Sequence, residues 1–197
     1  MFFNQPNPAA ELEAAVQEYR IHDNLGALLD RLKRLAQTSD PDLLASATEP
    51  YRDMPEVVIP VFEHVVQVRP DDAQAHVLLA NAYWLTGRGS EPVERLATRA
   101  KTIDPQNRGA WHLWALSEPD IRGRIGRWLE VIERFPHDSL ARAAMADNAV
   151  SLAGAEHDPQ ALDLAVATYR QLLGEATEPA HRRALEETLD KLREWKL

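Results

Sequence analysis

The stretch that decides the fold begins at Asp71, ends at Pro105, and reads DDAQAHVLLANAYWLTGRGSEPVERLATRAKTIDP. Apolar side chains recur at helical spacing in both halves of it. One of the two aspartates at its start can cap a first helix, and Gly87 can end that helix because glycine adopts positive φ without strain. Ser90 is expected to cap a second helix, which the final proline closes. The stretch therefore predicts two helices joined by a tight glycine turn.

Small residues stand where these two helices are expected to touch. Ala80 and Ala100 have almost no side chain, so the helix axes can approach closely. The small Ala80 is followed three positions later by Tyr83. The second helix has Ala100 near its end and is closed by Pro105. This pattern resembles the tetratricopeptide repeat (TPR). Two departures are visible: the glycine turn is one residue longer than usual, and Val93 replaces a small Ala.

The same spacing returns along the chain. Closing prolines stand at positions 70, 105 and 136, and these intervals bracket the TPR period of ~34 residues. After the second of these prolines, Trp111 stands at the family's characteristic Trp position. The neighbouring segments therefore read as less regular copies of the central hairpin.

The resemblance implies an all-α fold, a right-handed α-α superhelix of TPR-like hairpins with roughly ten or eleven helices. One hairpin buries only part of its apolar surface, so stability is expected to come from stacking. We expect one solenoid over residues 1–197, in four parts. These are an N-terminal hairpin (1–38), three TPR-like repeats (39–136), an irregular fourth hairpin (137–175) and a C-terminal capping helix (176–197).

Two predictions concern the second half of the chain. The amphipathic segment 121–135 should point Trp128 and Leu129 inward, as part of one apolar stripe. Gly154 can end the helix that begins near Ser139, because glycine commonly follows a helix C-terminus.

Two groups of basic residues are expected to be solvated helix faces rather than phosphate sites. The first follows Asp23 and Asn24, either of which can cap its helix, and comprises Arg31, Lys33 and Arg34. The second surrounds a Gly-Arg-Ile-Gly sequence that resembles a phosphate loop only superficially, and comprises Arg122, Arg124 and Arg127.

Composition limits the possible partners and location. The 197 residues carry a formal net charge of −9 and no cysteine. The charge argues against a nucleic-acid or anionic-membrane partner, and without cysteine there is neither disulfide nor thiolate metal site. No run of ~18 apolar residues could span a bilayer. The N-terminal residues do not read as a secretory signal, so a cytoplasmic location is expected.

Catalytic and metal motifs are absent from the sequence. The chain has no H-E-x-x-H, no two histidines at i,i+4, no G-x-S-x-G elbow and no P-loop. The lone Glu-x-x-His at Glu178 lacks the second pair that a di-iron bundle needs. We therefore expect no catalytic residues, no metal and no cofactor.

The resemblance also implies a binding surface. In TPR arrays the first helices of successive pairs line the concave groove, where peptides commonly dock. By position, Val77, Asn81 and Trp84 would face that groove, and His112 would follow from the next pair. For Trp84, burial against a neighbouring helix is an equal alternative.

Asn81 matches an Asn that holds the peptide main chain or carboxylate in chaperone-tail-binding relatives. The companion Lys and Arg residues of that clamp are replaced here by Val77, Leu78 and Leu113. This argues against recognition of an acidic C-terminal tail in the concave groove.

These observations favour a non-catalytic protein–protein interaction module, a scaffold or adaptor that binds a peptide or partner helix. The alternative is a self-assembling structural protein, a possible homo-oligomer in which Phe2 and Phe3 are buried against another copy. A helical enzyme is a third hypothesis, and it requires a deep pocket with converging His and carboxylate side chains.

Overall fold

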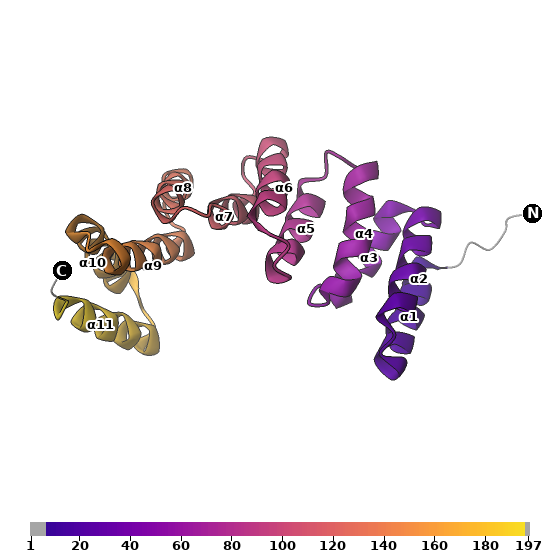
Figure 1. Ribbon diagram of the computed structural model, residues 1–197, viewed down its shortest axis with the longest axis horizontal. Helices are drawn as coiled ribbons and strands as arrows, with labels where there is room; N and C mark the ends of the chain where they lie inside the picture. Colours follow the sequence, from indigo (N-terminus) through magenta and orange to yellow (C-terminus); the bar gives the residue numbers. More distant parts are fainter. Residues whose placement is uncertain (1–6, 196–197) are drawn as a thin grey trace, which may run out of the picture. The chain divides into compact units, whose positions relative to one another are not determined.

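The computed structural model describes residues 7–195, and in that range the chain forms eleven α-helices, one short 3-10 helix and no strand (Figure 1). The predicted all-α fold and helix number are confirmed. The chain divides into two compact units, Met1–Leu113 and Trp114–Leu197, which are described in turn. The prediction of one continuous solenoid with four parts stays a prediction.

The first unit is a stack of helical hairpins. Helix α1 packs on both α2 and α3, α2 packs on α4, α4 on α5, and α5 on α6. Contacts of α1 with α3 and of α2 with α4 place each helix of the first hairpin on the matching helix of the next. The elements are α1 (Pro8–His22), α2 (Leu25–Thr38), α3 (Pro41–Ala47), the 3-10 helix (Glu49–Tyr51), α4 (Pro55–Val68), α5 (Ala73–Leu85) and α6 (Ser90–Ile103), with α7 (Arg108–Leu116) at the division.

Short polar side chains fix where these helices begin. Asn24, Asp40 and Asp72 each accept a hydrogen bond from a first-turn backbone N–H, at 3.0, 2.9 and 2.9 Å. The prediction that Ser90 caps α6 is wrong. Ser90 is the first helical residue, and the cap position is taken by Gly89 at φ 97°, a backbone conformation that favours glycine.

The core of the first unit follows the predicted apolar stripes. Ala80 and Ala100 are both fully buried in the hairpin of α5 and α6, which is the environment expected at a close helix–helix contact. The other fully buried side chains include Leu12, Val16, Leu32, Leu44, Val57, Val61, Val65 and Val93.

His76 is a buried titratable side chain within this core. It is only 6% exposed, and its Nδ1 lies 2.8 Å from the carbonyl oxygen of Asp72. Burial lowers the pKa of His76 from its ordinary value of 6.5, and the nearby Arg99 guanidinium lowers it further, against an opposing effect of the Asp71 carboxylate. The folded state therefore favours the neutral imidazole.

This burial predicts a pH-dependent stability. Because the pKa of His76 is lower in the folded state, the unfolded state binds more protons as the pH falls through 6.5. The stability that the neutral His76 contributes is fully present above that pH. It is lost as the pH falls toward the pKa of His76 in the folded state. Between about pH 7.5 and pH 5.5, urea titrations should show a smaller loss of unfolding free energy for His76→Gln than for the wild type. The exposed-histidine control His22→Gln should retain the wild-type loss; equal losses in all three proteins would contradict the prediction.

The second unit contains α8 (Ile121–Arg134), α9 (Ser139–Glu156), α10 (Pro159–Glu175) and α11 (Pro179–Arg193), each packed on the next. Trp128 is 2% exposed, as predicted, and Ile125 and Val131 are buried with it. The prediction that Leu129 points inward is wrong, because its side chain is 44% exposed. The buried stripe of α8 is narrower than the apolar stripe in the sequence.

Helix α9 does not end at Gly154, so that prediction is also wrong. The helix continues to Glu156, and His157 ends it with φ 53°. A glycine inside a helix costs only about 1 kcal/mol relative to alanine, so it does not by itself stop a helix. Gly154 instead lies under Trp195: a Cβ at this position would be 3.4 Å from the indole Cη2.

Candidate functional site

The predicted binding residues lie on one exposed face of α5 and on α7. Val77, Asn81 and Trp84 are spaced by four and three residues, so they share a side of α5. Asn81 is exposed and Trp84 is 41% exposed. Trp84 is therefore not a fully buried core residue, and its place in a binding groove stays a prediction. Leu85, four residues after Asn81, is 65% exposed and was missed, although the same spacing rule includes it.

The first turn of α7 lies against this face. A Cβ at Gly109 would be 3.3 Å from Cγ1 of Val77, so glycine permits the close approach, and Val77 is half-buried. His112 comes one turn after Gly109 and is half-buried too. We call the surface formed by Val77, Asn81, Trp84, Leu85 and His112 the α5–α7 face.

Aromatic side chains hold both helices of this face in place. Tyr83 Oη donates a hydrogen bond of 2.6 Å to Glu63 of α4, and burial followed by this bond raises the pKa of Tyr83 to about 12. On α7, Trp111 Nε1 donates to the carbonyl oxygen of Pro105 at 3.0 Å. Lys101 Nζ of α6 lies 3.7 Å from the centroid of the Trp111 ring. The face is thus presented on a fixed backbone.

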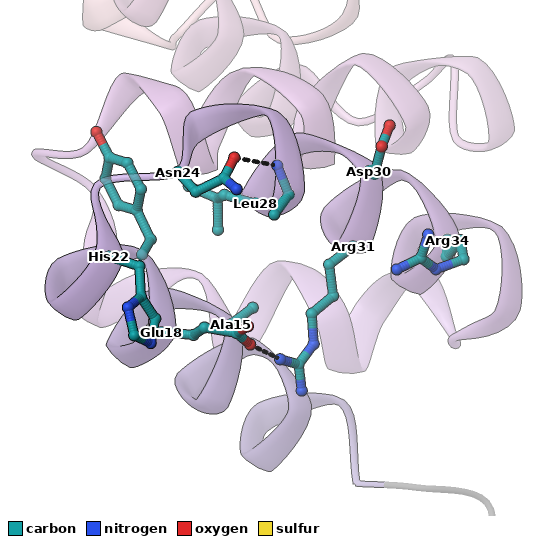
Figure 2. A pocket seen from close by; sticks show the side chains of 10 residues that line it. Ala15, Glu18, His22, Asn24, Leu28, Asp30, Arg31 and Arg34 are labelled. Atoms are coloured by element: carbon teal, nitrogen blue, oxygen red, sulfur yellow. Dashed lines mark hydrogen bonds and ion pairs between the residues drawn. The ribbon is translucent and has the colours of Figure 1, made fainter.

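A hollow of about 530 Å³ lies between α1 and α2 (Figure 2). Figure 2 shows Arg31 extending from α2 toward Glu18 of α1, at 2.9 Å, and Arg31 also reaches Glu11 at 3.2 Å. The prediction that Arg31 belongs to a solvated basic face is wrong, because the side chain is half-buried and ion-paired to α1. The charge of Arg31 is therefore already compensated by two carboxylates of α1.

The arginines of α8 also differ from their predicted role as a solvent face. Arg124 Nε donates to the carbonyl oxygen of Glu118 at 2.7 Å, and Arg127 Nη1 donates to that of Trp114 at 2.8 Å. Both side chains are half-buried and hold the turn between α7 and α8. Only Arg122 is exposed, and it pairs with Glu156 and Asp158 at 2.6 and 3.0 Å. Because all three arginines already have protein partners, this geometry does not support a phosphate-binding loop.

Two further features bear on function. From residue 7 to residue 195, no group of three or more His, Asp or Glu side chains is arranged to hold a metal ion. In the same part of the chain, no helix is long and apolar enough to cross a bilayer.

Comparison with known proteins gives the fold class. No family model matches the chain, and no curated protein matches it. Solved structures do match, and the protein has the all-α, TPR-like helical-repeat fold that the sequence predicted.

One such structure is TTC0263, a thermophilic TPR protein in Thermus thermophilus. It is 17% identical with a TM-score of 0.55, and the match covers 94% of this chain and 98% of that one. MamA is 14% identical with a TM-score of 0.58, covering 82% and 96%. A MamA RS-1 ArsTM double mutant is 15% identical with a TM-score of 0.55, covering 93% and 97%. At these identities the likeness is one of fold.

Proposed function

We propose that this protein is a non-catalytic protein–protein interaction module, a scaffold or adaptor that binds a peptide or partner helix on the α5–α7 face. The observation that carries the proposal is the pair of exposed apolar side chains on α5, Trp84 at 41% and Leu85 at 65% exposure. Contiguous exposed apolar surface can mark an interaction site, and Trp is enriched among the residues that contribute most to binding. A TPR-like fold supports a protein-binding role in general.

The chemistry of the face suits a peptide. The Asn81 amide both donates and accepts hydrogen bonds, so it can pair with either polar group of a peptide backbone. Trp84 and Leu85 supply the apolar contact beside it. With a net charge of −9 on the whole chain, long-range electrostatics favour a neutral or basic partner at this face. A cytoplasmic location is part of the same proposal.

The proposal predicts that Trp84→Ala weakens partner binding. Partners are captured from the native cell extract by crosslinking to the full chain, identified, and titrated against each variant by calorimetry. Trp84→Ala and Asn81→Ala should each raise the Kd at least about tenfold, as expected for central interface residues. Ile21→Ala is the matched control, since Ile21 is an apolar side chain of the same unit, 73% exposed on α1. If the partners bind the α5 variants and the control equally well, the α5–α7 face is not the binding site.

The self-assembly alternative involves Phe2 and Phe3, which lie outside residues 7–195, and it stays a prediction. Light scattering separates it from the interaction proposal, because a strict monomer at high concentration contradicts self-assembly and is compatible with a heterologous partner. The enzyme hypothesis requires His and carboxylate side chains converging in a deep pocket, and we do not propose it.

A further inference from the structure

A second hollow lies on other helices of the first unit. It has a volume of about 400 Å³ and lies between α2 and α4, which pack side by side, with the turn after α5 contributing Arg88. We call it the α2–α4 groove. Its lining comprises Leu29, Lys33, Ala36, Gln37, Ile59, Pro60, Glu63, His64, Gln67 and Arg88.

The floor of the α2–α4 groove is apolar. Ile59 is 7% exposed and Ala36 is 3% exposed, whereas Leu29 remains 38% exposed at the edge. Pro60 lies inside α4 and has no backbone N–H, so its ring adds apolar surface without a polar group. A volume of this size is at the lower end of the range for ligand pockets. It accommodates one or two apolar side chains rather than a whole helix.

The rim is cationic, although the protein as a whole is acidic. The ammonium group of Lys33 forms no hydrogen bond or ion pair with any residue between 7 and 195. The Arg88 guanidinium lies over the Tyr83 ring, 5.4 Å from its centroid, a contact that leaves its N–H donors available at the edge. Lys33 and Arg88 outnumber Glu63, the one carboxylate of the lining, so the groove carries a local positive charge within a chain of net charge −9.

The polar groups between floor and rim suit a peptide backbone. Glu63, the carboxylate of the lining, already accepts the hydrogen bond from Tyr83 Oη at 2.6 Å. Gln37 and Gln67 are exposed, and each side-chain amide can both donate and accept. An occupant of this groove therefore meets an apolar floor, two amides and a cationic rim.

From this arrangement we infer that the α2–α4 groove binds an acidic peptide segment with an apolar anchor side chain. The anchor rests on Leu29, Ile59 and Pro60, and the flanking carboxylates meet Lys33 and Arg88. Charge complementarity favours this occupant, because the cationic rim attracts carboxylates and repels a basic peptide. The inference goes beyond the proposed function, because it concerns different helices and a partner of opposite charge.

The test uses three fluorescein-labelled peptides and the full chain. The first carries leucines flanked by Glu and Asp, the second replaces the acids with Gln and Asn, and the third keeps the acids and replaces the leucines with Gly. Fluorescence anisotropy should show saturable binding of the first peptide only. Lys33→Glu, Arg88→Glu and Leu29→Asn should each weaken that binding at least about tenfold.

Arg34→Glu is the matched control for this experiment. It makes the same charge change on the same helix as Lys33→Glu, but Arg34 lines the α1–α2 hollow of Figure 2. This control should change the affinity less than about twofold, since its charge acts only at long range through solvent. Circular dichroism checks that every variant is folded, which is expected because the substituted side chains are all partly or fully exposed.

Several results would overturn the inference. The first is an absence of saturable binding by the acidic peptide. The second is equal affinity for the neutral peptide, and the third is an equal loss of affinity with Arg34→Glu. Binding to phosphatidylserine vesicles in place of the peptide would identify a membrane surface instead. Sedimentation showing self-association that Lys33→Glu abolishes would identify a second copy of this chain. Because Trp84→Ala should leave the acidic peptide's affinity unchanged, a failure here is distinguishable from a failure of the α5–α7 proposal.

Discussion

Replacing Trp128 with alanine is expected to lower the free energy of unfolding by about 3–5 kcal/mol, the usual cost of truncating a buried Trp or Phe. The indole is 2% exposed and is among the largest fully buried side chains in residues 7–195. It lies in α8, which packs directly on α9. Removing it leaves a cavity that the close-packed neighbouring side chains fill only in part, so the lost contacts are not recovered. Urea denaturation followed by circular dichroism measures the change.

The adjacent residue supplies the control for this prediction. Leu129 is 44% exposed, so Leu129→Ala should change the free energy by no more than about 0.5 kcal/mol, as for ordinary surface substitutions. The pair also separates structure from sequence pattern, because the pattern places both residues on one buried stripe. An unchanged denaturation midpoint for Trp128→Ala would remove this side chain from the core. A large effect of Leu129→Ala would show that the apolar stripe is buried after all.

Helix starts that an Asp or Asn side chain caps were predictable from the sequence, because their causes are local. An Asp or Asn followed by a helical pattern caps the helix with its own side chain, as Asn24, Asp72 and Asp158 do. No distant residue has to be known for this. The glycine turn after α5 is similarly local, since Gly87 at φ 66° and Gly89 at φ 97° adopt backbone conformations that favour glycine.

Other features depend on which helix packs where, and the sequence alone could not supply them. Glycine commonly follows a helix C-terminus, yet α9 continues through Gly154. This glycine lies against Trp195, which is distant in sequence. The predicted cap at Ser90 was wrong by one position, because Gly89 at φ 97° takes the cap position of α6. The arginines of α2 and α8 were predicted wrongly for the same reason. Helical spacing indicates which residues share a side of a helix, but not whether another segment covers that side.

The candidate site was predictable to the same extent. The spacing of Val77, Asn81 and Trp84 places them together on α5 from sequence alone. Whether the Trp84 side chain is covered depends on the packing of neighbouring helices, and its 41% exposure is a structural result. The α2–α4 groove was not predictable, because Lys33 and Arg88 come from segments that only the stacked hairpins bring together.

The second large effect is expected for Arg127→Ala, with a loss of about 2–3 kcal/mol in the free energy of unfolding, the range for charged hydrogen bonds that are largely shielded from water. Arg127 Nη2 lies 2.9 Å from the Glu118 carboxylate, and the two side chains are 16% and 19% exposed. Its Nη1 donates to the Trp114 carbonyl oxygen, and the guanidinium lies 4.7 Å from the Trp114 ring centroid. Substitution leaves the half-buried Glu118 carboxylate without its cation and removes one of two side-chain hydrogen bonds to the Trp114 carbonyl oxygen, the other coming from Ser117 Oγ.

Arg122→Ala is the control for Arg127→Ala, since it removes the same side chain from the same helix and breaks ion pairs of similar length. Arg122 is 54% exposed in its side chain and pairs with Glu156 and Asp158 at 2.6 and 3.0 Å. Exposed ion pairs contribute little, because water and salt already compensate the charges. The Arg122 variant should therefore unfold close to the wild-type urea midpoint and the Arg127 variant well below it. Equal midpoints for the two variants would mean that Arg127 is solvated, as its place in the sequence pattern first indicated.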